Sequence, residues 1–294
     1  MTVIEVSQRP VLVGGTGRSG STIVGHLLDH HPALALTRPM EVRFLAGRFG
    51  LADALATALG GGAIDAPEGA TPERAVQRIV DRWYIRAPDV GLHTSIDRDE
   101  LDGLLDHYLS GMPAHPVEAT AALARGIMAR VAGAQVRWVD TTPANARQAD
   151  RMLMIYPQAR VISVIRDGRD VAASFVQQSF GPDDVFEALT QWERRMQRIH
   201  RATSRAPSGT VLSIELMDLV TREREATVER LCEFLEIEDD PSMREWFDES
   251  ITPASAHSGR WRTQFDSSTT RKIDRAYERI VERLESAGVP VPRE

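Results

Sequence analysis

The segment VLVGGTGRSGSTIVGHLLDHHP, residues 11–32, restricts the fold of this chain more than any other part of its sequence. A short apolar run leads into a glycine-rich loop, and the loop leads into a helix with an apolar face. Gly15 and Gly20 bracket four residues, as in a Walker A loop, but Ser21 stands where that loop has lysine. The positive charge comes earlier, at Arg18. The segment therefore predicts a strand, an anion-binding loop and a helix, without the usual lysine.

The same order of strand and helix returns along the rest of the chain. Apolar runs precede polar loops in VRWVDTTP, ARVISVIRDGRD and GTVLSIELMDL, with helical patterns between them. The run RVISVI is almost continuously apolar, which is typical of a parallel strand buried on both faces. We expect an α/β, P-loop-like three-layer fold, in which helices cover both sides of a central parallel sheet. Residues 45–130 are interpreted as a helical insertion within a single domain, residues 1–294.

Composition and charge argue against several classes of protein. The chain has 294 residues and a net charge of −7, so a general nucleic-acid binder is not expected, and a few placed groups must bind any anion. No signal segment and no membrane-spanning run is visible, so we expect a cytoplasmic protein without stable membrane insertion. The single cysteine, Cys232, lies on an apolar stripe and predicts no internal disulfide. A homodimer stays open.

The glycine loop combines three sources of anion affinity. Its glycines permit positive φ and let backbone N–H groups close around an anion. The following helix directs its partly positive N-terminus at the same point. Hydroxyl groups and the guanidinium of Arg18 add donors. The predicted binding residues are Gly15, Thr16, Gly17, Arg18, Ser19, Gly20, Ser21 and Thr22.

A second candidate anion site follows the run RVISVI. Arg166 closes this predicted strand, and Ser174 lies eight residues later in the next helix. Both positions face the carboxyl edge of a parallel sheet, which is also the edge of the glycine loop. The sequence RDGRD alone would be interpreted as a surface salt-bridge cluster. Together with the glycine loop, it predicts a ligand with two separated anionic groups.

These two motifs together resemble those of the sulfotransferase superfamily. GTGRSGSTIVGHLLDHHP is similar to the 5′-phosphosulfate loop of its bacterial and Golgi-type branches, and VIRDGRDVAASF to its 3′-phosphate motif. VDTTPAN resembles its Lys-Thr-Pro segment, and HSGRWR its late glycine-tryptophan segment. The resemblance implies 3′-phosphoadenosine-5′-phosphosulfate (PAPS) as co-substrate, 3′-phosphoadenosine-5′-phosphate (PAP) as product, and no metal. It implies contacts to the 3′-phosphate and adenine from Arg166, Ser174, Arg260, Trp261 and Arg262.

The resemblance also implies a general base that takes the proton of the acceptor hydroxyl. Glu41 in TRPMEVRFL resembles the glutamate that acts as general base in the Glu-x-Arg segment of tyrosylprotein sulfotransferases. Arg43 stands at the position of the arginine in that segment. Arg18 would stabilise charge on the leaving phosphate. A surface glutamate at a helix start is an equal interpretation of Glu41. Cytosolic small-molecule sulfotransferases use a histidine base, so the alternatives are His26, His30 and His31.

Two positions depart from the family pattern. Thr141 stands where the family commonly has lysine, and Ile214 where many members have an aromatic residue. Arg43 could supply the missing cation, and Trp261 or Phe265 the stack on adenine. His26 and His30 lack a third ligand at metal spacing, so no metal site is predicted.

The acceptor is left open by the sequence. The expected acceptor is a hydroxyl of a small molecule, a glycan or a lipid, with peptidyl tyrosine also open, bound beside residues 45–130. Trp83 and Tyr84 are candidates to stack on it, or belong to the helix core. Two other functions stay open on the same fold, a non-catalytic nucleotide-binding protein and a P-loop kinase-like enzyme.

Overall fold

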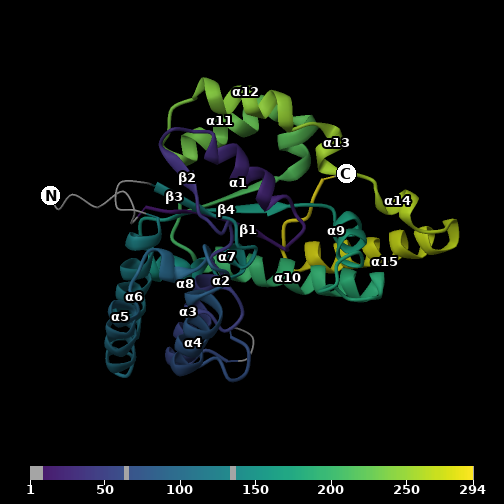
Figure 1. Cartoon of the computed structure of the whole chain (residues 1–294). Helices are drawn as coiled ribbons and strands as arrows, with labels where there is room; N and C mark the ends of the chain where they lie inside the picture. The colour runs from purple at the N-terminus through teal and green to yellow at the C-terminus, as the bar shows by residue number, and fades with distance from the viewer. Residues whose placement is uncertain (1–8, 63–65, 133–136, 294) are drawn as a thin grey trace.

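The computed structural model describes residues 9–62, 66–132 and 137–293. Parallel strands form its central five-stranded sheet in the order β2-β3-β1-β4-β5 (Figure 1). The α/β fold with a central parallel sheet is therefore confirmed. The sequence patterns indicated four of these strands and missed β2, which has only three residues. The strands are β1 (Val11–Gly15), β2 (Leu34–Leu36), β3 (Arg137–Asp140), β4 (Arg160–Ile165) and β5 (Val211–Glu215).

Helices cover both faces of the sheet, as the alternating pattern predicts (Figure 1). One layer contains α1 (Ser21–Asp29), α11 (Arg224–Leu235), α12 (Pro241–Ser250) and α13 (Pro253–Ala256). The π-helical segment Asp218–Arg222 leads into α11. The opposite layer contains α7 (Ala144–Arg147), α8 (Ala149–Ile155), α9 (Gly168–Phe175), α10 (Val185–Arg205), α14 (Trp261–Gln264) and α15 (Ser267–Ser286).

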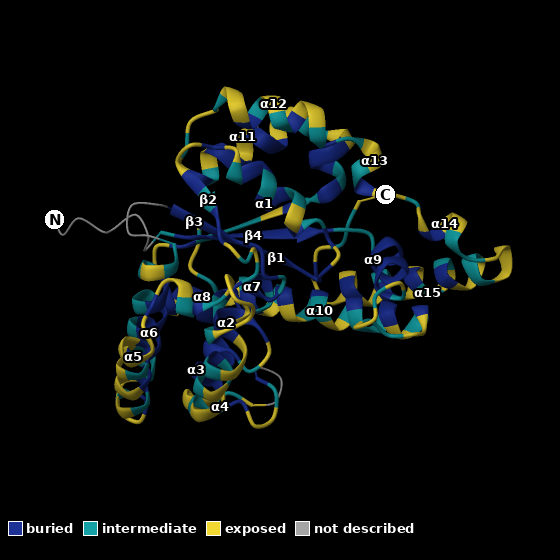
Figure 2. Ribbon diagram, in the orientation of Figure 1, coloured by how far each residue is buried: buried dark blue, intermediate teal, exposed yellow. Residues whose placement is uncertain are grey.

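Alternation along β1 divides the core between these two layers. Val11 and Val13 pack with α1 and α11 on one face, whereas Leu12 packs in the cluster of the opposite face. Successive side chains of a strand point to opposite faces, so both faces of β1 are apolar. The strands are accordingly buried throughout β1, β3 and most of β4, while the outer surfaces of the helices are exposed (Figure 2).

The segment between β2 and β3 is largely helical, as its sequence predicts. Trp83 packs edge-on against Phe44, with ring centroids 5.5 Å apart, and is only 6% exposed. Trp83 is therefore part of the core of this segment rather than an exposed stacking platform. In the described part of the chain, no helix is long and apolar enough to cross a membrane. The elements are α2 (Arg43–Ala46), α3 (Leu51–Ala58), α4 (Pro72–Ile79), a π-helical segment (Val80–Tyr84), a 3₁₀ turn (Leu92–Thr94), α5 (Arg98–Gly111) and α6 (Pro116–Val131).

Candidate functional site

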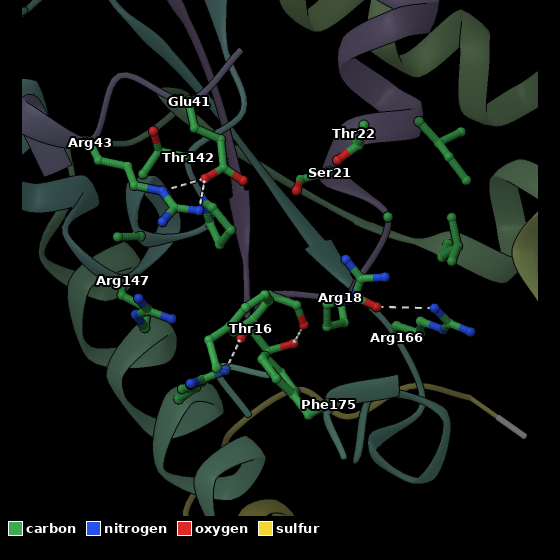
Figure 3. Close-up of a pocket in the computed structure, with 18 of the residues that line it drawn as sticks. Thr16, Arg18, Ser21, Thr22, Glu41, Arg43, Thr142, Arg147, Arg166 and Phe175 are labelled. Atoms are coloured by element: carbon green, nitrogen blue, oxygen red, sulfur yellow. Dashed lines mark hydrogen bonds and ion pairs between the residues drawn. The ribbon is translucent and has the colours of Figure 1, made fainter. Parts of the chain in front are cut away.

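A cavity of about 430 Å³ lies at the carboxyl edge of the sheet. The glycine loop after β1 forms part of its wall, and so do the segment before α2 and the turn after β3. Residues from α10 and from the end of α13 complete the wall. Figure 3 shows Glu41, Arg43 and Arg147 on one side of this cavity and Arg166 on the other. The loop that the sequence singled out therefore opens into this cavity.

The glycine loop has the conformation of an anion-binding nest. Gly17, Arg18 and Gly20 have φ values of 82°, 56° and 102°, a region that disfavours most side chains. Gly20 is the N-cap of α1 and offers no side-chain acceptor, so the first N–H groups of the helix lack a cap. A Cβ at Gly20 would lie 2.7 Å from Leu216. Glycine is thus required at Gly20 for close packing, and the uncapped N–H groups are available to an anion.

Most of the predicted loop residues line the cavity, but two do not. Gly15 ends β1, and a Cβ there would lie 2.3 Å from the Ser19 hydroxyl. Ser19 is fully buried beneath the loop, and its Oγ has no hydrogen-bond partner. The Ser19 hydroxyl is therefore turned inward, away from the cavity that it was expected to serve. The loop residues on the cavity wall are Thr16, Gly17, Arg18, Gly20, Ser21 and Thr22.

The two predicted anion motifs meet in the structure. Arg18 donates from Nε to Ser174 Oγ at 3.0 Å. Arg166 donates to the carbonyl of Arg18 at 3.0 Å and to the carbonyls of Ala256 and His257 at 2.8 and 3.1 Å. Burial lowers the pKa of Arg166, partly offset by the charges of nearby aspartates. The guanidinium of Arg166 thus ties the glycine loop to the segment after α13.

The HSGRWR segment reaches the same region, but not with the side chains that the sequence indicated. Trp261 is 2% exposed and packs beneath the guanidinium of Arg169, 4.7 Å from the ring centroid. The guanidinium of Arg262 also lies over this indole, 4.4 Å from a ring centroid. Arg260 is exposed and lies near enough for its charge to lower the pKa of Arg166. None of Arg260, Trp261 and Arg262 lines the cavity, because the indole is an anchor of the apolar core between α9 and α15.

Glu41 lies on the cavity wall opposite Arg166, with Arg43 beside it (Figure 3). One carboxylate oxygen of Glu41 accepts from Nε and from a terminal nitrogen of Arg43, at 2.6 and 2.5 Å. The other oxygen has no recorded partner among the described residues. The ion pair therefore orients the carboxylate and leaves one oxygen available to a further donor.

Buried Asp140 and its neighbour Thr141, at the end of β3, hold the backbone on either side of Glu41. The carboxylate of Asp140 accepts from the N–H of Val42 at 2.9 Å and from the side chain of Asn145 at 2.9 Å. Thr141 donates from its N–H and its hydroxyl to the carbonyl of Met40, both at 2.9 Å. Thr141 therefore serves as a backbone anchor and does not line the cavity.

Two arginines that the sequence did not single out contribute to the cavity. Arg195 of α10 donates to the carbonyl of Thr16 at 2.7 Å and lies over the ring of Phe175. Arg147 of α7 makes no recorded hydrogen bond or ion pair in the described structure, and burial, with the charges of Arg195 and Arg198, lowers its pKa to about 10. Arg147 thus brings a free cation to the wall of the cavity, on the same side as Glu41 (Figure 3). The sequence does not distinguish these two arginines from the many others, because the packing of α7 and α10 decides which side chains point into the cavity.

The histidines considered as alternative bases lie elsewhere. His30 stacks on Trp246 at 4.9 Å, and His26 is tilted against the same ring at 6.3 Å. His31 is buried, with its ring hydrogen-bonded to the backbone at both nitrogens. Among the described residues, His257 is the histidine that lines the cavity, on the side of Arg166 and away from Glu41. Among all the residues that the structure describes, no group of three or more His, Cys, Asp or Glu side chains is placed to hold a metal ion.

Comparisons with known proteins show the fold and the family of the chain. The chain shares its fold with the sulfotransferase domain of the Synechococcus PCC 7002 olefin synthase, at 16% identity and a TM-score of 0.53, with 97% of each chain covered. It also resembles the sulfotransferase domain from the curacin biosynthetic pathway, at 15% identity and a TM-score of 0.55, with 97% and 99% covered. No curated protein matches the chain in sequence. The pattern of the sulfotransferase family matches residues 10–241, and the chain therefore belongs to the sulfotransferase family.

Proposed function

We propose that this protein transfers the sulfuryl group of PAPS to a hydroxyl of a small-molecule, glycan or lipid acceptor and releases PAP. The observation that carries the proposal is the uncapped, positive-φ loop at the start of α1, joined through Arg18 to Ser174 and Arg166. The loop offers uncapped N–H groups on one side of the cavity, where Arg166 also lies on the wall and Ser174 lies behind it, bonded to Arg18. Glu41 and Arg43 lie on the other side, where an acceptor would enter.

The residues on the nucleotide side fit a ligand with phosphates at both ends. The N–H groups from Gly17 to Thr22, with the hydroxyls of Ser21 and Thr22, would bind the 5′-phosphosulfate. Arg166 and Ser174 would bind the 3′-phosphate. Apolar Ile23, Leu216 and Ala256 line the same cavity and would contact the adenosine. A buried Trp261 leaves these aliphatic side chains, rather than an indole, as the surface for the base.

The acceptor side supplies proton transfer and charge stabilisation. The free oxygen of Glu41 would take the proton of the acceptor hydroxyl while the acceptor oxygen bonds to sulfur. The bond between sulfur and the bridging phosphate oxygen breaks, and its electron pair stays on the 5′-phosphate of PAP. Arg18 and the loop N–H groups would stabilise that charge, because they are already oriented before the reaction. Arg147, or Arg43, would take the place of the family's lysine at Thr141.

A transfer assay with two labelled donors tests this function. The protein would be incubated with an extract of small molecules and either PAPS labelled at sulfur or ATP labelled at the γ-phosphate. We expect labelled products with PAPS as donor and none with ATP. The variant Arg18→Ala should abolish the transfer from PAPS. Transfer from ATP and none from PAPS would instead support a kinase-like enzyme and overturn the proposal. PAPS transfer that is unchanged by Arg18→Ala would also overturn it.

A further inference from the structure

A second cavity, of about 380 Å³, adjoins the first on the side away from Arg166. The two cavities share Arg48, Ala144, Arg147 and Arg195 as wall residues. The second cavity continues from there along α10 towards Arg205. It is therefore placed beside the acceptor side of the site, and we call it the arginine cavity.

The arginine cavity concentrates positive charge in a protein whose net charge is negative. Seven arginines line it against two aspartates, while the whole chain carries a net charge of −7. Arg195, Arg198, Arg201 and Arg205 all lie on α10, at spacings of three or four residues, and so share one face of that helix. Like charges held this close repel one another, so the arrangement favours an anion that neutralises them.

The acidic residues of the arginine cavity do not neutralise it. The carboxylate of Asp53 accepts from the N–H of Phe49 at 2.8 Å and from the side chain of Gln148 at 2.7 Å. Asp150 forms a 3.6 Å ion pair with Arg205. Arg147, Arg198 and Arg201 make no recorded hydrogen bond or ion pair within the described residues. Three guanidiniums thus have free donors around one partly open cavity.

We propose that the arginine cavity binds an anionic group of the acceptor, either a phosphate ester or a carboxylate, while the acceptor hydroxyl lies between Glu41 and the glycine loop. This inference rests on the proposed function, because it assigns the substrate class of the same site. A guanidinium binds either anion with paired hydrogen bonds, which suits a cavity lined by several of them. The shared Arg147 would then contact both the reacting region and the anionic group.

The shape of the arginine cavity favours a small anion over a polymer. Its volume is similar to that of the first cavity, and helices α7, α8 and α10 enclose it on several sides. A nucleic acid or polyanionic chain would need a long open basic surface, and the net charge of −7 opposes this at long range. A single phosphate or carboxylate group can be bound by the arginines of this cavity alone.

Calorimetry on the PAP-saturated protein tests this proposal, because PAP occupies the nucleotide side and leaves the arginine cavity open. Pyrophosphate represents a phosphate ester, and malonate represents a carboxylate. We expect one of them to bind, and the tighter of the two identifies the source of the anion. The double variant Arg198→Gln/Arg201→Gln should weaken that binding by at least about 100-fold, since two charged hydrogen-bond donors are lost. Both residues are exposed, so the fold should be retained.

Arg194→Gln is the matched control. Arg194 lies on α10 and is exposed, but it does not line the arginine cavity. Its replacement should leave anion binding unchanged. The proposal is overturned if neither anion binds the PAP-saturated wild type, or if the double variant binds as tightly as the Arg194→Gln control. Failure of PAP to bind would instead overturn the proposed function, whereas arginine-dependent pyrophosphate binding would still support an anion site.

Discussion

The two sides of the site differ in how many of their arginines the protein holds, although Arg43 on the acceptor side is paired with Glu41. On the nucleotide side, Arg18, Arg166 and Arg195 are held by Ser174 or by backbone carbonyls. On the acceptor side, Arg147 and Arg198 have no recorded protein partner in the described structure. A cation that the protein holds is already oriented for a ligand, whereas an unpaired side chain loses rotamer freedom when a ligand binds it. Under the proposed function, the side that binds PAPS would be largely formed before binding, whereas Arg147 and Arg198 would become ordered with the acceptor.

Replacing Glu41 should produce the largest effect and tests the acceptor side alone. Glu41→Gln keeps the size of the side chain and one acceptor oxygen, but it cannot take a proton. We expect turnover to fall about 10²- to 10⁴-fold, with PAP affinity nearly unchanged. Turnover would be measured with the acceptor identified in the transfer assay, and PAP affinity by calorimetry.

Arg43→Ala serves as the companion variant. It should also slow transfer, because the guanidinium of Arg43 orients the carboxylate of Glu41. Near-normal turnover of Glu41→Gln would remove Glu41 from the mechanism. A rate profile with an apparent pKa near the ordinary histidine value of about 6.5 would then point to His257, on the opposite side of the cavity.

The buried aspartate of the arginine cavity should make stability depend on pH. Burial raises the pKa of Asp53 from 3.8 to about 6, partly offset by hydrogen bonds from Phe49 and Gln148. Between these values the folded protein binds more protons than the unfolded chain, so the free energy of unfolding falls as pH rises from about 4 to 6. The loss should total about 3 kcal/mol.

Urea unfolding of the wild type and of Asp53→Asn, at several pH values from 4 to 7.5, measures this loss. The variant has no titrating group at this position, so its stability should decline less over the same range. Parallel pH dependence in the two proteins would show that the Asp53 carboxylate is not desolvated as the structure indicates.

Ser174 distinguishes the two ends of the nucleotide. Ser174→Ala should weaken PAP binding more than binding of adenosine 5′-phosphosulfate, because only PAP carries the 3′-phosphate. A hydrogen bond to a charged group is worth about 1.5–3 kcal/mol, so the affinity for PAP should fall roughly 10- to 100-fold. Arg166→Ala should weaken the binding of both ligands, since Arg166 also holds the carbonyl of Arg18 in the glycine loop. Equal losses for both ligands in Ser174→Ala would place Ser174 in the support of the loop instead.

The same contrast explains how much the sequence predicts. The glycine loop and the Arg166–Ser174 pair follow strand ends within short continuous segments, so local sequence and parallel topology place them together. Arg147 and Arg195 depend on how α7 and α10 pack against the sheet, which no local pattern specifies. Trp261 lies in a family motif, yet it is buried beneath Arg169. Burial of a large aromatic ring stabilises the folded state more than its exposure at the cavity would. The β2 strand is too short to show a period.

Glu41 is an intermediate case. Its local sequence indicates a base by resemblance, but the sequence does not show what holds it at the sheet edge. That support comes from Asp140 and Thr141, which bond to the backbone of Val42 and Met40 from about a hundred residues along the chain. An aspartate that follows the predicted strand in VDTTP is a sequence signal for such a support, but its backbone partner is too far along the chain for a local pattern to show.

Equilibrium unfolding in the presence of PAP or ATP tests the central claim most directly, namely that the nucleotide side is built for two separated anionic groups. At about 100 times its dissociation constant, PAP should raise the free energy of unfolding by about 2.7 kcal/mol, because it binds only the folded state. ATP at the same concentration should raise it much less, since it has no 3′-phosphate for Arg166 and Ser174. An unchanged unfolding midpoint with PAP, together with a raised midpoint with ATP, would contradict the account.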